Sequence, residues 1–469
     1  MRIALLTPPY DIMKKGYGSK KKVKGGLFPP LGLGYLASVL IKDAHAVKII
    51  DASSYEYSNE QVRDLLEKFK PELIGISSVT SSAQESYSLA NFLKEKMPGI
   101  PIIYGGPHVD CFPQTIFEGI KDLDLAVYGE GEVTFREAVN FYLANGKLPS
   151  NLPGTWAKSD GVWQKNPPTK PVIKLDDLPP PAYELFDWKF YRPLPLQYKK
   201  LPTANMITSR GCPYGKCAFC NEAGRAGQLY RRHSPERVLE EIKILQKLGV
   251  KEIAFWDDNF LIGEDWVFKF CNLLDQSGIK IPWSVVARVD TISRPMLERA
   301  VKSGLWNIFF GIESGNQDLL DRIKKGTTLE QIRQAIKWCN ELGIDTRGSF
   351  MLALPGETPE KGINTIKFAC DIDVTYAQFL PTHPDWGTEL YDDAIASGRL
   401  VPMYQGRTSV TYVPDGYKSA DDVRKMQKLA YRKFYFRPFY FWKHLKRLGN
   451  LGKIMQYWDA FLYLMGIST

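Results

Sequence analysis

The chain of 469 residues carries three closely spaced cysteines, Cys212, Cys217 and Cys220. Three thiolates on one short loop can bind three corners of a four-iron four-sulfur (4Fe–4S) cluster. The fourth iron is then open, and it can chelate the amino and carboxylate groups of a small molecule. Zinc is the alternative metal, with His233 as the nearest candidate for the fourth ligand that a structural zinc site needs. The sequence therefore predicts a catalytic iron–sulfur site at this loop.

The other four cysteines, Cys111, Cys271, Cys339 and Cys370, are scattered along the chain. Free cysteine behaves as a small apolar residue in protein cores, and we expect these four to pack there. Clustered cysteines in a reducing compartment indicate metal binding rather than disulfides. Residues 1–6 read as a strand rather than as a signal peptide, so the expected localisation is cytoplasmic. No run of apolar residues is long enough to predict a membrane span.

The cysteine loop needs a framework that holds it beside other polar residues. From residue 205 to about residue 381 the sequence alternates apolar strand patterns with amphipathic helix patterns. The expected strands cover residues 205–209, 252–256, 283–287, 307–311, 347–352 and 376–381. Six such units predict a partial (β/α)6 barrel, open along one side, whose site lies at the carboxyl ends of the strands. The cysteine loop follows the first of these strands.

The first 150 residues also alternate strands and helices, at a spacing that favours a doubly wound, Rossmann-like parallel sheet. Ligands of such sheets bind at the carboxyl ends of the strands. Glycine and serine at these ends let a large planar ligand approach the backbone closely. The candidate binding residues there are Pro8, Pro9, Ser77, Ser78, Val79, Gly105, Gly106, His108, Tyr128, Gly129 and Glu130.

The expected organisation of this α/β protein has four parts. They are the sheet domain (1–150), a linker with a stiff proline-rich stretch (151–200), the barrel (201–395) and a mostly helical, basic and aromatic region (396–469). The net charge of +9 is concentrated in residues 14–24 and 424–453. Such runs are either solvated faces or surfaces that attract phosphates or an anionic membrane.

Together the motifs resemble those of radical S-adenosylmethionine (SAM) enzymes that carry a cobalamin-binding domain, the class B type. The run from Arg210 to Cys220 is similar to the signature loop of that superfamily, with Phe219 before the last cysteine. The usual spacing is C-x3-C-x2-C, whereas this chain has C-x4-C-x2-C. The pair Gly215–Lys216 is expected to absorb the extra residue, because glycine permits a wider turn.

The resemblance implies which residues at the strand ends bind SAM. They are Phe219, Asp258, Arg288, Glu313, Ser314 and Pro355. Arg288 would pair with the methionine carboxylate, Glu313 or Ser314 would bind the ribose hydroxyls, and Phe219 would lie near the adenine. For each charged residue taken alone, a surface ion pair is the alternative. Glu357, after the fifth strand, either joins this pocket or caps the following helix.

The resemblance also assigns the first domain to cobalamin. Related modules carry an Asp-x-His-x-x-Gly stretch whose histidine ligates cobalt, but residues 10–28 contain no histidine. The lower face of cobalt is then expected to bind water, another residue or nothing. His108 is expected to line the pocket rather than to ligate the metal. The alternative is a chain that kept the fold and lost cobalamin.

The implied cofactors are a 4Fe–4S cluster, SAM and cobalamin in its methylcobalamin form. With them we expect an enzyme that methylates an unactivated carbon, since the cofactors carry the hard chemistry and the protein aims the radical and excludes water. An oxidative cyclase or rearrangement enzyme without methyl transfer is the alternative. A non-enzymatic iron–sulfur protein that binds nucleic acid would explain the basic tail but not the barrel motifs, and a nucleic-acid partner is not favoured.

Aromatic and basic residues are interleaved in residues 431–448, and residues 454–464 are strongly apolar. This pattern is typical of a helix that lies on a membrane surface. It predicts a hydrophobic, lipid-like or isoprenoid substrate, reached through peripheral membrane contact of the C-terminal region. The alternative is that the segment packs as ordinary core across the mouth of the barrel. A reductant such as ferredoxin or flavodoxin is the expected protein partner.

Overall fold

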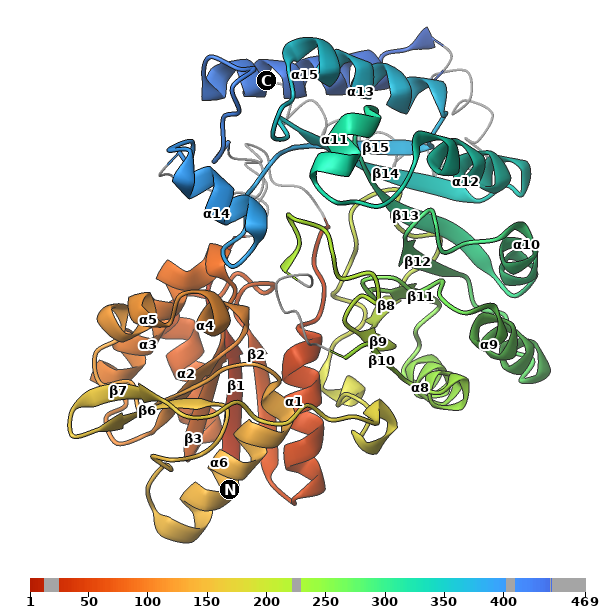
Figure 1. Ribbon diagram of the computed structural model, residues 1–469. Helices are drawn as coiled ribbons and strands as arrows, with labels where there is room; N and C mark the ends of the chain where they lie inside the picture. Colours follow the sequence, from red (N-terminus) through yellow and green to blue (C-terminus); the bar gives the residue numbers. More distant parts are fainter. Residues whose placement is uncertain (12–24, 222–228, 402–409, 439, 441–469) are drawn as a thin grey trace. The chain divides into compact units, whose positions relative to one another are not determined.

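The structure is a computed structural model that describes residues 1–11, 25–221, 229–401, 410–438 and 440. It divides into two compact units, one made of residues 1–15 and 27–191 and the other of residues 16–26 and 192–469. Each unit is built on one main sheet with helices packed against it (Figure 1).

The first unit has a seven-stranded sheet in the order β2-β1-β3-β4-β5-β6-β7. The first five strands in this order are parallel, and β6 and β7 are antiparallel. Its elements are β1 (Arg2–Thr7), α1 (Leu31–Lys42), β2 (Ala46–Asp51), α2 (Asn59–Phe69), β3 (Leu73–Ser77), α3 (Ala83–Lys96), β4 (Ile102–Gly105), α4 (Pro107–Cys111), α5 (Pro113–Gly119), β5 (Leu125–Val127), α6 (Gly131–Asn145), β6 (Thr155–Ser159) and β7 (Val162–Lys165). The predicted doubly wound sheet is confirmed.

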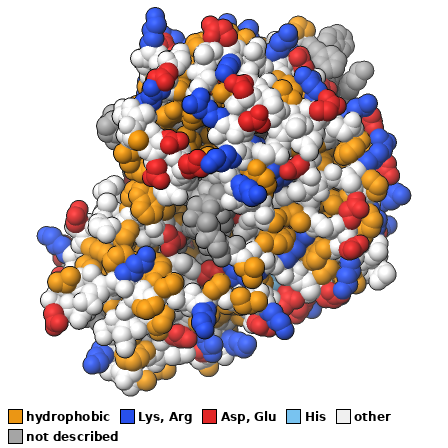
Figure 2. Space-filling view, in the orientation of Figure 1, with side chains coloured by type: hydrophobic (Ala, Val, Ile, Leu, Met, Phe, Trp, Pro, Cys, Tyr) orange, Lys and Arg blue, Asp and Glu red, His pale blue; other side chains and the backbone are white. Residues whose placement is uncertain are grey.

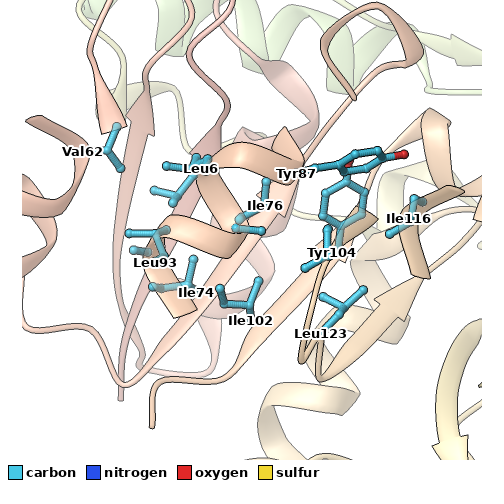
Figure 3. Close-up of a cluster of buried hydrophobic side chains, with 14 of the residues drawn as sticks. Leu6, Val62, Ile74, Ile76, Tyr87, Leu93, Ile102, Tyr104, Ile116 and Leu123 are labelled. Atoms are coloured by element: carbon cyan, nitrogen blue, oxygen red, sulfur yellow. The ribbon is translucent and has the colours of Figure 1, made fainter. Parts of the chain in front are cut away.

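Helices cover both faces of this sheet because its strands are apolar on both sides. On β1, Leu6 packs into the cluster under α2, α3 and α5, whereas Leu5 packs into the cluster under α1 and α6. Figure 3 shows the first of these clusters, in which Leu93 of α3 lies beside Ile74 of β3. Full burial of each such side chain contributes about 1.5–3 kcal/mol.

The segment expected as a linker folds onto the first unit as far as Tyr191. Strands β6 and β7 form a hairpin, and Trp163 of this hairpin stacks on Phe117 with ring centroids 4.3 Å apart. Leu178 joins the core, and the Tyr191 hydroxyl donates a hydrogen bond of 3.1 Å to the buried Asp51 carboxylate. The hairpin is short and its second strand is largely exposed, so its sequence lacks the apolar alternation that identifies a strand.

The second unit contains a six-stranded parallel sheet in the order β8-β11-β12-β13-β14-β15. Its elements are β8 (Thr203–Met206), β9 (Ser209–Arg210), β10 (Arg231–Arg232), α8 (Pro235–Lys247), β11 (Glu252–Phe255), α9 (Glu264–Gln276), β12 (Trp283–Ala287), α10 (Arg294–Lys302), β13 (Leu305–Glu313), α11 (Gln317–Arg322), α12 (Leu329–Glu341), β14 (Asp345–Leu352), α13 (Pro359–Asp371), β15 (Tyr376–Pro381), α14 (Glu389–Ala396) and α15 (Ala420–Tyr435). This is the predicted partial barrel.

Several barrel helices begin at a serine or threonine whose side chain accepts a hydrogen bond from the first turn. Ser234, Ser293 and Thr358 cap α8, α10 and α13. Each of these helices has a proline at its first or second residue. Such caps, together with proline in the first turn, fix where a helix starts. The loops that follow the strands therefore end at defined points, which keeps the strand-end residues in place.

Helix α15 covers the free edge of β15. Gln427, Tyr431 and Tyr435 lie on one face of this helix and bond to backbone groups of Phe379 and Ala377, at distances from 2.8 to 3.3 Å. These bonds satisfy the donors and acceptors of an edge strand that has no further strand beside it. The aromatic side chains of α15 thus pack as core, here along β15. The rest of the aromatic and basic stretch, including residues 454–464, lies outside the described residues.

Charged side chains of both signs are interspersed on the face of the molecule that Figure 2 shows. The space-filling view has no broad area of Lys and Arg alone on that face among the described residues. In the described part of the chain, no helix combines the length and the apolar character needed to cross a membrane.

Candidate active site

The cysteine loop follows β9 and is tied to other parts of the barrel at three points. The Tyr214 hydroxyl donates a hydrogen bond of 2.9 Å to the Lys324 carbonyl, and the Ala218 amide donates one of 3.0 Å to the Ile323 carbonyl. The Leu390 amide at the start of α14 donates one of 2.9 Å to the Ala218 carbonyl. The loop is therefore held by the turn after α11 on one side and by α14 on the other.

Two glycines let the loop turn. Gly211 and Gly215 have φ angles of 84° and 54°, in the left-handed region that glycine adopts without strain. Gly215 lies in the stretch of four residues between Cys212 and Cys217, where the chain is one residue longer than the usual motif. Further along, the Cys220 amide donates a hydrogen bond of 3.2 Å to the Cys217 carbonyl. The glycine conformation accommodates the extra residue.

The three cysteines differ in exposure, since Cys217 is buried and the other two are partly exposed. Burial raises the pKa of the Cys217 thiol, and the cations of Lys325 and Arg288 act in the opposite direction. Arg288 Nη1 lies 3.8 Å from Cys217 Sγ. Because metals bind the thiolate, these two cations favour the ligating state.

The three cysteines on this loop are the residues that would hold a cluster. Among the described residues, no three His, Cys, Asp or Glu side chains are grouped as ligands for one ion. In a cubane each thiolate binds a different iron, and three cysteines on one loop match that requirement.

Arg288 was expected to present its guanidinium to the SAM carboxylate. In the structure its fork is already engaged, with hydrogen bonds of 2.9 and 2.8 Å to the Asp290 carboxylate and one of 2.9 Å to the Lys325 carbonyl. The guanidinium also lies over the Tyr214 ring, 4.0 Å from its centroid. Arg288 thus joins the cysteine loop to the turn that carries Lys325, and it places a positive charge beside Cys217.

Glu313 ends β13 at an irregularity in the pairing with β14 and has a φ of 66°. Its carboxylate forms an ion pair of 2.8 Å with Lys325 Nζ, and both side chains are only 8% exposed. The Lys325 ammonium lies 5.7 Å from the centre of the Phe219 ring. Lys325 was not among the expected site residues, because it lies in a turn after a short helix rather than at a strand end.

Phe219 and Ser314, two other residues expected to bind SAM, lie in different surroundings. Phe219 packs against Leu319, Ile323 and Leu354, so it forms part of an apolar wall above the barrel. Ser314 is fully buried, and its hydroxyl accepts a hydrogen bond of 3.1 Å from the Asn316 amide. Ser314 therefore organises the loop after β13 instead of offering its hydroxyl to solvent.

Pro355 lies in a loop that is held from beneath by the fully buried Glu357. The Glu357 carboxylate accepts hydrogen bonds from the Ala353 amide (2.7 Å) and the Tyr417 hydroxyl (2.8 Å). Burial raises the pKa of Glu357 to about 7. The cap of α13 is Thr358, so the alternative in which Glu357 caps this helix is wrong. Glu357 instead clamps the Pro355 loop to the segment that carries Tyr417.

Two consecutive aspartates, Asp257 and Asp258, follow β11 and differ in burial. Asp258 is exposed at the strand end. Its neighbour Asp257 is buried and accepts hydrogen bonds from the amide (2.5 Å) and hydroxyl (2.5 Å) of Thr208 and from the Ser209 amide (3.0 Å). Thr208 and Ser209 lead directly into the cysteine loop. Asp257, which was not an expected site residue, therefore anchors the start of that loop.

In the first unit, the glycines at the strand ends meet different surroundings. A Cβ on Gly105 would approach only the Val127 carbonyl oxygen, at 3.7 Å, and one on Gly129 would meet nothing within 4 Å. A Cβ on Gly106, which has a φ of 99°, would lie 2.5 Å from the Ser78 carbonyl oxygen. Gly105 and Gly129 thus leave open backbone that a large planar ligand such as cobalamin can approach, whereas Gly106 is required by internal packing.

His108 is buried beneath this edge. Its Nε2 lies 2.6 Å from the Tyr87 hydroxyl and its Nδ1 lies 3.3 Å from the Thr80 hydroxyl. Burial lowers the pKa of His108 to about 4. With both ring nitrogens hydrogen-bonded inside the unit, His108 is not available as a ligand for cobalt.

The remaining expected cobalamin residues lie at the same strand ends. Val79 is 48% exposed, and the Tyr128 hydroxyl donates a hydrogen bond of 2.6 Å to the Asn166 carbonyl. Glu130 occupies the residue before α6. Of the others, Pro8 and Ser78 are buried, and Pro9 and Ser77 are partly exposed. These residues surround the carboxyl edge of the sheet but differ in how much surface they offer.

Family models match both units of the chain. The radical SAM superfamily model matches residues 206–369, and the B12 binding domain model matches residues 22–139. An uncharacterized methyltransferase of Pyrococcus horikoshii is 34% identical over 441 residues, which cover 93% of each chain. An anaerobic magnesium-protoporphyrin IX monomethyl ester cyclase of Rubrivivax gelatinosus is 28% identical and is matched over 79% of this chain and 66% of its own.

Solved structures show the same fold. The radical SAM methyltransferase TsrM from Kitasatospora setae, with cobalamin and a 4Fe–4S cluster bound, has a TM-score of 0.71 at 16% identity and covers 93% of this chain and 89% of its own. The cobalamin-dependent radical enzyme OxsB, with aqua-cobalamin and SAM bound, has a TM-score of 0.73 at 18% identity and covers 98% of this chain and 71% of its own. The chain belongs to the radical SAM enzymes that carry a B12-binding domain, a class whose cofactors are a 4Fe–4S cluster, SAM and cobalamin.

Proposed function

We propose that this enzyme is a cobalamin-dependent methyltransferase that holds its cluster on Cys212, Cys217 and Cys220 and methylates an unactivated carbon. The observation that carries the proposal is the cysteine loop, which stands at the carboxyl end of the first barrel strands and is tied to the turn after α11 and to α14. When bound, the cluster supplies an electron for SAM cleavage and cobalamin supplies a transferable methyl group.

The residues around the loop have distinct tasks in this proposal. Arg288 and Lys325 place positive charge beside Cys217, on the side where a SAM carboxylate would bind. Glu313, held by Lys325, would accept hydrogen bonds from ribose hydroxyls, and Phe219 would provide an apolar wall for the adenine. Asp257 holds the loop in place.

The first unit would hold cobalamin at its carboxyl edge. Support comes from the open backbone at Gly105 and Gly129, which lets a corrin ring approach closely. His108 is committed to Tyr87 and Thr80, so the lower face of cobalt would bind water, another residue or nothing.

The proposed substrate is a hydrophobic small molecule, lipid-like or isoprenoid in character. Support comes from the side chains of Phe309, Met351 and Leu380, whose strand positions face the inside of the barrel. The expected contact with a membrane surface depends on residues 441–469, which lie outside the described residues. Co-sedimentation with anionic vesicles at low salt tests that contact, and no binding would remove it from the proposal.

An acidic electron carrier such as ferredoxin or flavodoxin is the proposed reductant. Support comes from Lys216, which is exposed on the cysteine loop itself. A cation beside the cluster would attract an acidic partner and orient it for electron transfer. Lys216→Glu should slow SAM cleavage with flavodoxin while leaving cleavage with a chemical reductant unchanged. Equal slowing with both reductants would argue against docking at this loop.

An oxidative cyclase or rearrangement reaction is the second candidate. The observation that favours it is the similarity to the cyclase of Rubrivivax gelatinosus. A methyltransferase product gains one CH2 unit, whereas a cyclase product does not. The full chain, purified without oxygen and reconstituted with iron, sulfide and cobalamin, can be incubated with a cell extract and SAM that carries a deuterated methyl group. A labelled product supports methyl transfer, and an unlabelled product that has not gained a CH2 unit supports the cyclase or rearrangement.

A further inference from the structure

Strands β14 and β15 separate two sets of side chains by simple alternation. Arg347, Ser349 and Met351 on β14 are partly exposed, as are Gln378 and Leu380 on β15. The intervening residues of both strands are buried, and those of β15 pack under α15. Successive side chains of a strand point to opposite faces, so the partly exposed set faces the inside of the barrel.

The strand register arranges this inward set in layers. Met351 pairs with Leu380, Ser349 with Gln378, and Arg347 with Tyr376. The uppermost layer lies next to the proposed cofactor site, because Met351 packs in the same apolar cluster as Phe219. Two residues along a strand span about 7 Å, so Ser349 and Gln378 lie one such step below Met351, and Arg347 lies two steps below.

The inward-facing layers of β14 and β15 form a column with Arg347 at its bottom. The guanidinium of Arg347 has no acidic partner among the described residues. Its Nε donates a hydrogen bond of 2.8 Å to Asn307 Oδ1, and the group lies over the Phe309 ring at 5.2 Å. No carboxylate of the described residues lies within ion-pair distance of it. Burial lowers the pKa of Arg347 to about 10, and Glu252 acts on it only at longer range. The Glu252 carboxylate is instead occupied by backbone amides and the Trp306 indole.

Other polar groups along the column also lack partners. The side chains of Ser349 and Gln378, which are partly exposed, form no hydrogen bond with the described residues. A donor-rich column with a free guanidinium fork at its base is therefore suited to a ligand that brings oxygen acceptors and negative charge.

We infer that the substrate is an amphiphile whose anionic group, a carboxylate or a phosphate, binds to Arg347 inside the barrel. Ser349 and Gln378 donate hydrogen bonds along the same path, and the apolar part of the substrate lies higher, against Met351 and Leu380. This inference rests on the proposed function, since it assigns the substrate class of that reaction. It makes Arg347 a specificity-determining residue, because the free fork matches the geometry of these two anions.

Binding of matched probes to the full-length, anaerobically reconstituted chain tests the inference. The probes are octanoate, octyl phosphate and 1-octanol, which share a tail and differ in the head group, together with inorganic phosphate. Titration calorimetry should show that one or both charged amphiphiles bind at least about tenfold more tightly than octanol, a difference of about 1.4 kcal/mol. The preferred head group then tells a carboxylate substrate from a phosphate substrate. Equal binding of the three amphiphiles would overturn the inference.

Three variants locate the effect. Arg347→Gln should lower the affinity for the charged amphiphiles to that for octanol. Arg294→Gln, which changes an exposed arginine on α10, should leave every affinity unchanged. Arg347→Met should not lower stability to denaturant, because it removes a buried charge that has no ion-pair partner. Loss of stability in Arg347→Met with unchanged probe binding in Arg347→Gln would make Arg347 a structural residue and contradict the inference.

SAM cleavage in the absence of substrate separates this inference from the proposed function. Wild type and the surface control Arg294→Gln should both release 5′-deoxyadenosine and methionine at equal rates. If the wild type cleaves SAM but shows no preference for charged probes, the inference alone fails. If it binds the charged probes but does not cleave SAM, the proposed function fails and the anion site stands.

Discussion

At the carboxyl edge of the first unit, the loops after β3 and β4 carry small or uncharged side chains, whereas the same edge of the barrel carries charged side chains that are paired with one another. Ser78, Gly106 and the neutral His108 pack or bond inside the first unit. In the barrel, Arg288 pairs with Asp290 and Lys325 pairs with Glu313. The loops after β3 and β4 are held by close packing of the backbone, whereas the carboxyl edge of the barrel is held by ion pairs.

This difference matches what each edge has to hold. A corrin ring is large and is fitted mainly by shape, so the first unit needs backbone that a ligand can approach. In the proposed function the barrel would hold a cluster on its own cysteine thiolates and a SAM with a carboxylate and hydroxyls, for which cations and a held carboxylate are suited. Substitutions at the two edges should therefore lower stability for different physical reasons.

The largest effect is expected in the barrel, from Lys325→Met. This change leaves the buried Glu313 carboxylate without its cation, which should lower stability by about 3–5 kcal/mol. The neighbouring Lys324→Met is the control, because Lys324 and Glu389 form an exposed pair, 53% and 51% accessible. Its cost should stay below about 1 kcal/mol. Denaturant unfolding of both variants measures the difference, and equal losses would contradict the role of the buried pair.

In the first unit, Gly106→Ala should act through packing rather than charge. The added Cβ would lie 2.5 Å from the Ser78 carbonyl oxygen at a φ of 99°. Strain and overpacking together should cost about 2–4 kcal/mol and reduce cobalamin binding, measured by absorbance titration. Gly146→Ala, at a similar positive φ with nothing within 4 Å, should cost only about 1 kcal/mol and leave cobalamin binding intact. Equal loss of cobalamin in both variants would count against the packing account.

A smaller effect is expected from pH, with opposite signs in the two units. The folded pKa of Glu357 is raised from 4.5 to about 7, so its contribution to stability is present at low pH and is lost as the pH rises towards 7. The folded pKa of His108 is lowered from 6.5 to about 4, so its contribution is present above 6.5 and is lost as the pH falls towards 4. Each shift corresponds to an effect on the order of 3 kcal/mol.

Substitution separates these two contributions. Glu357→Gln should remove the decline in stability between about pH 4.5 and 7, and His108→Gln should remove the decline between about pH 6.5 and 4. Denaturant unfolding at closely spaced pH values measures both slopes. If the decline between pH 4.5 and 7 persists in Glu357→Gln, or the decline between pH 6.5 and 4 persists in His108→Gln, another group is responsible for it.

The sequence predicted those features whose residues repeat at a regular spacing or lie close together along the chain. The cysteine loop, the six barrel strands and the parallel part of the first sheet follow from residue spacing and from apolar periodicity. Lys325 and Tyr417 could not be predicted in this way, because each meets its partner, Glu313 or Glu357, only through the tertiary fold. The β6–β7 hairpin was missed because its second strand is too polar to differ from a loop.

Predictions of role were less secure than predictions of position. Arg288 and Glu313 lie at the expected strand ends, but both are already paired inside the protein, so their charges act together with those of Asp290 and Lys325. Ser314 is buried within its own loop, which sequence spacing cannot reveal. A residue type at a strand end indicates a site, and only the neighbouring side chains decide which groups remain for a ligand.

Metal analysis and SAM cleavage of the anaerobically reconstituted chain test the central claim most directly. The wild type should bind about four irons and four sulfides per chain and convert SAM to 5′-deoxyadenosine once a reductant is added. A variant with Cys212, Cys217 and Cys220 all changed to alanine should bind no cluster and form no 5′-deoxyadenosine, while Cys271→Ala, in the barrel core, should keep both properties. Cluster binding and SAM cleavage that survive in the triple variant would contradict the account.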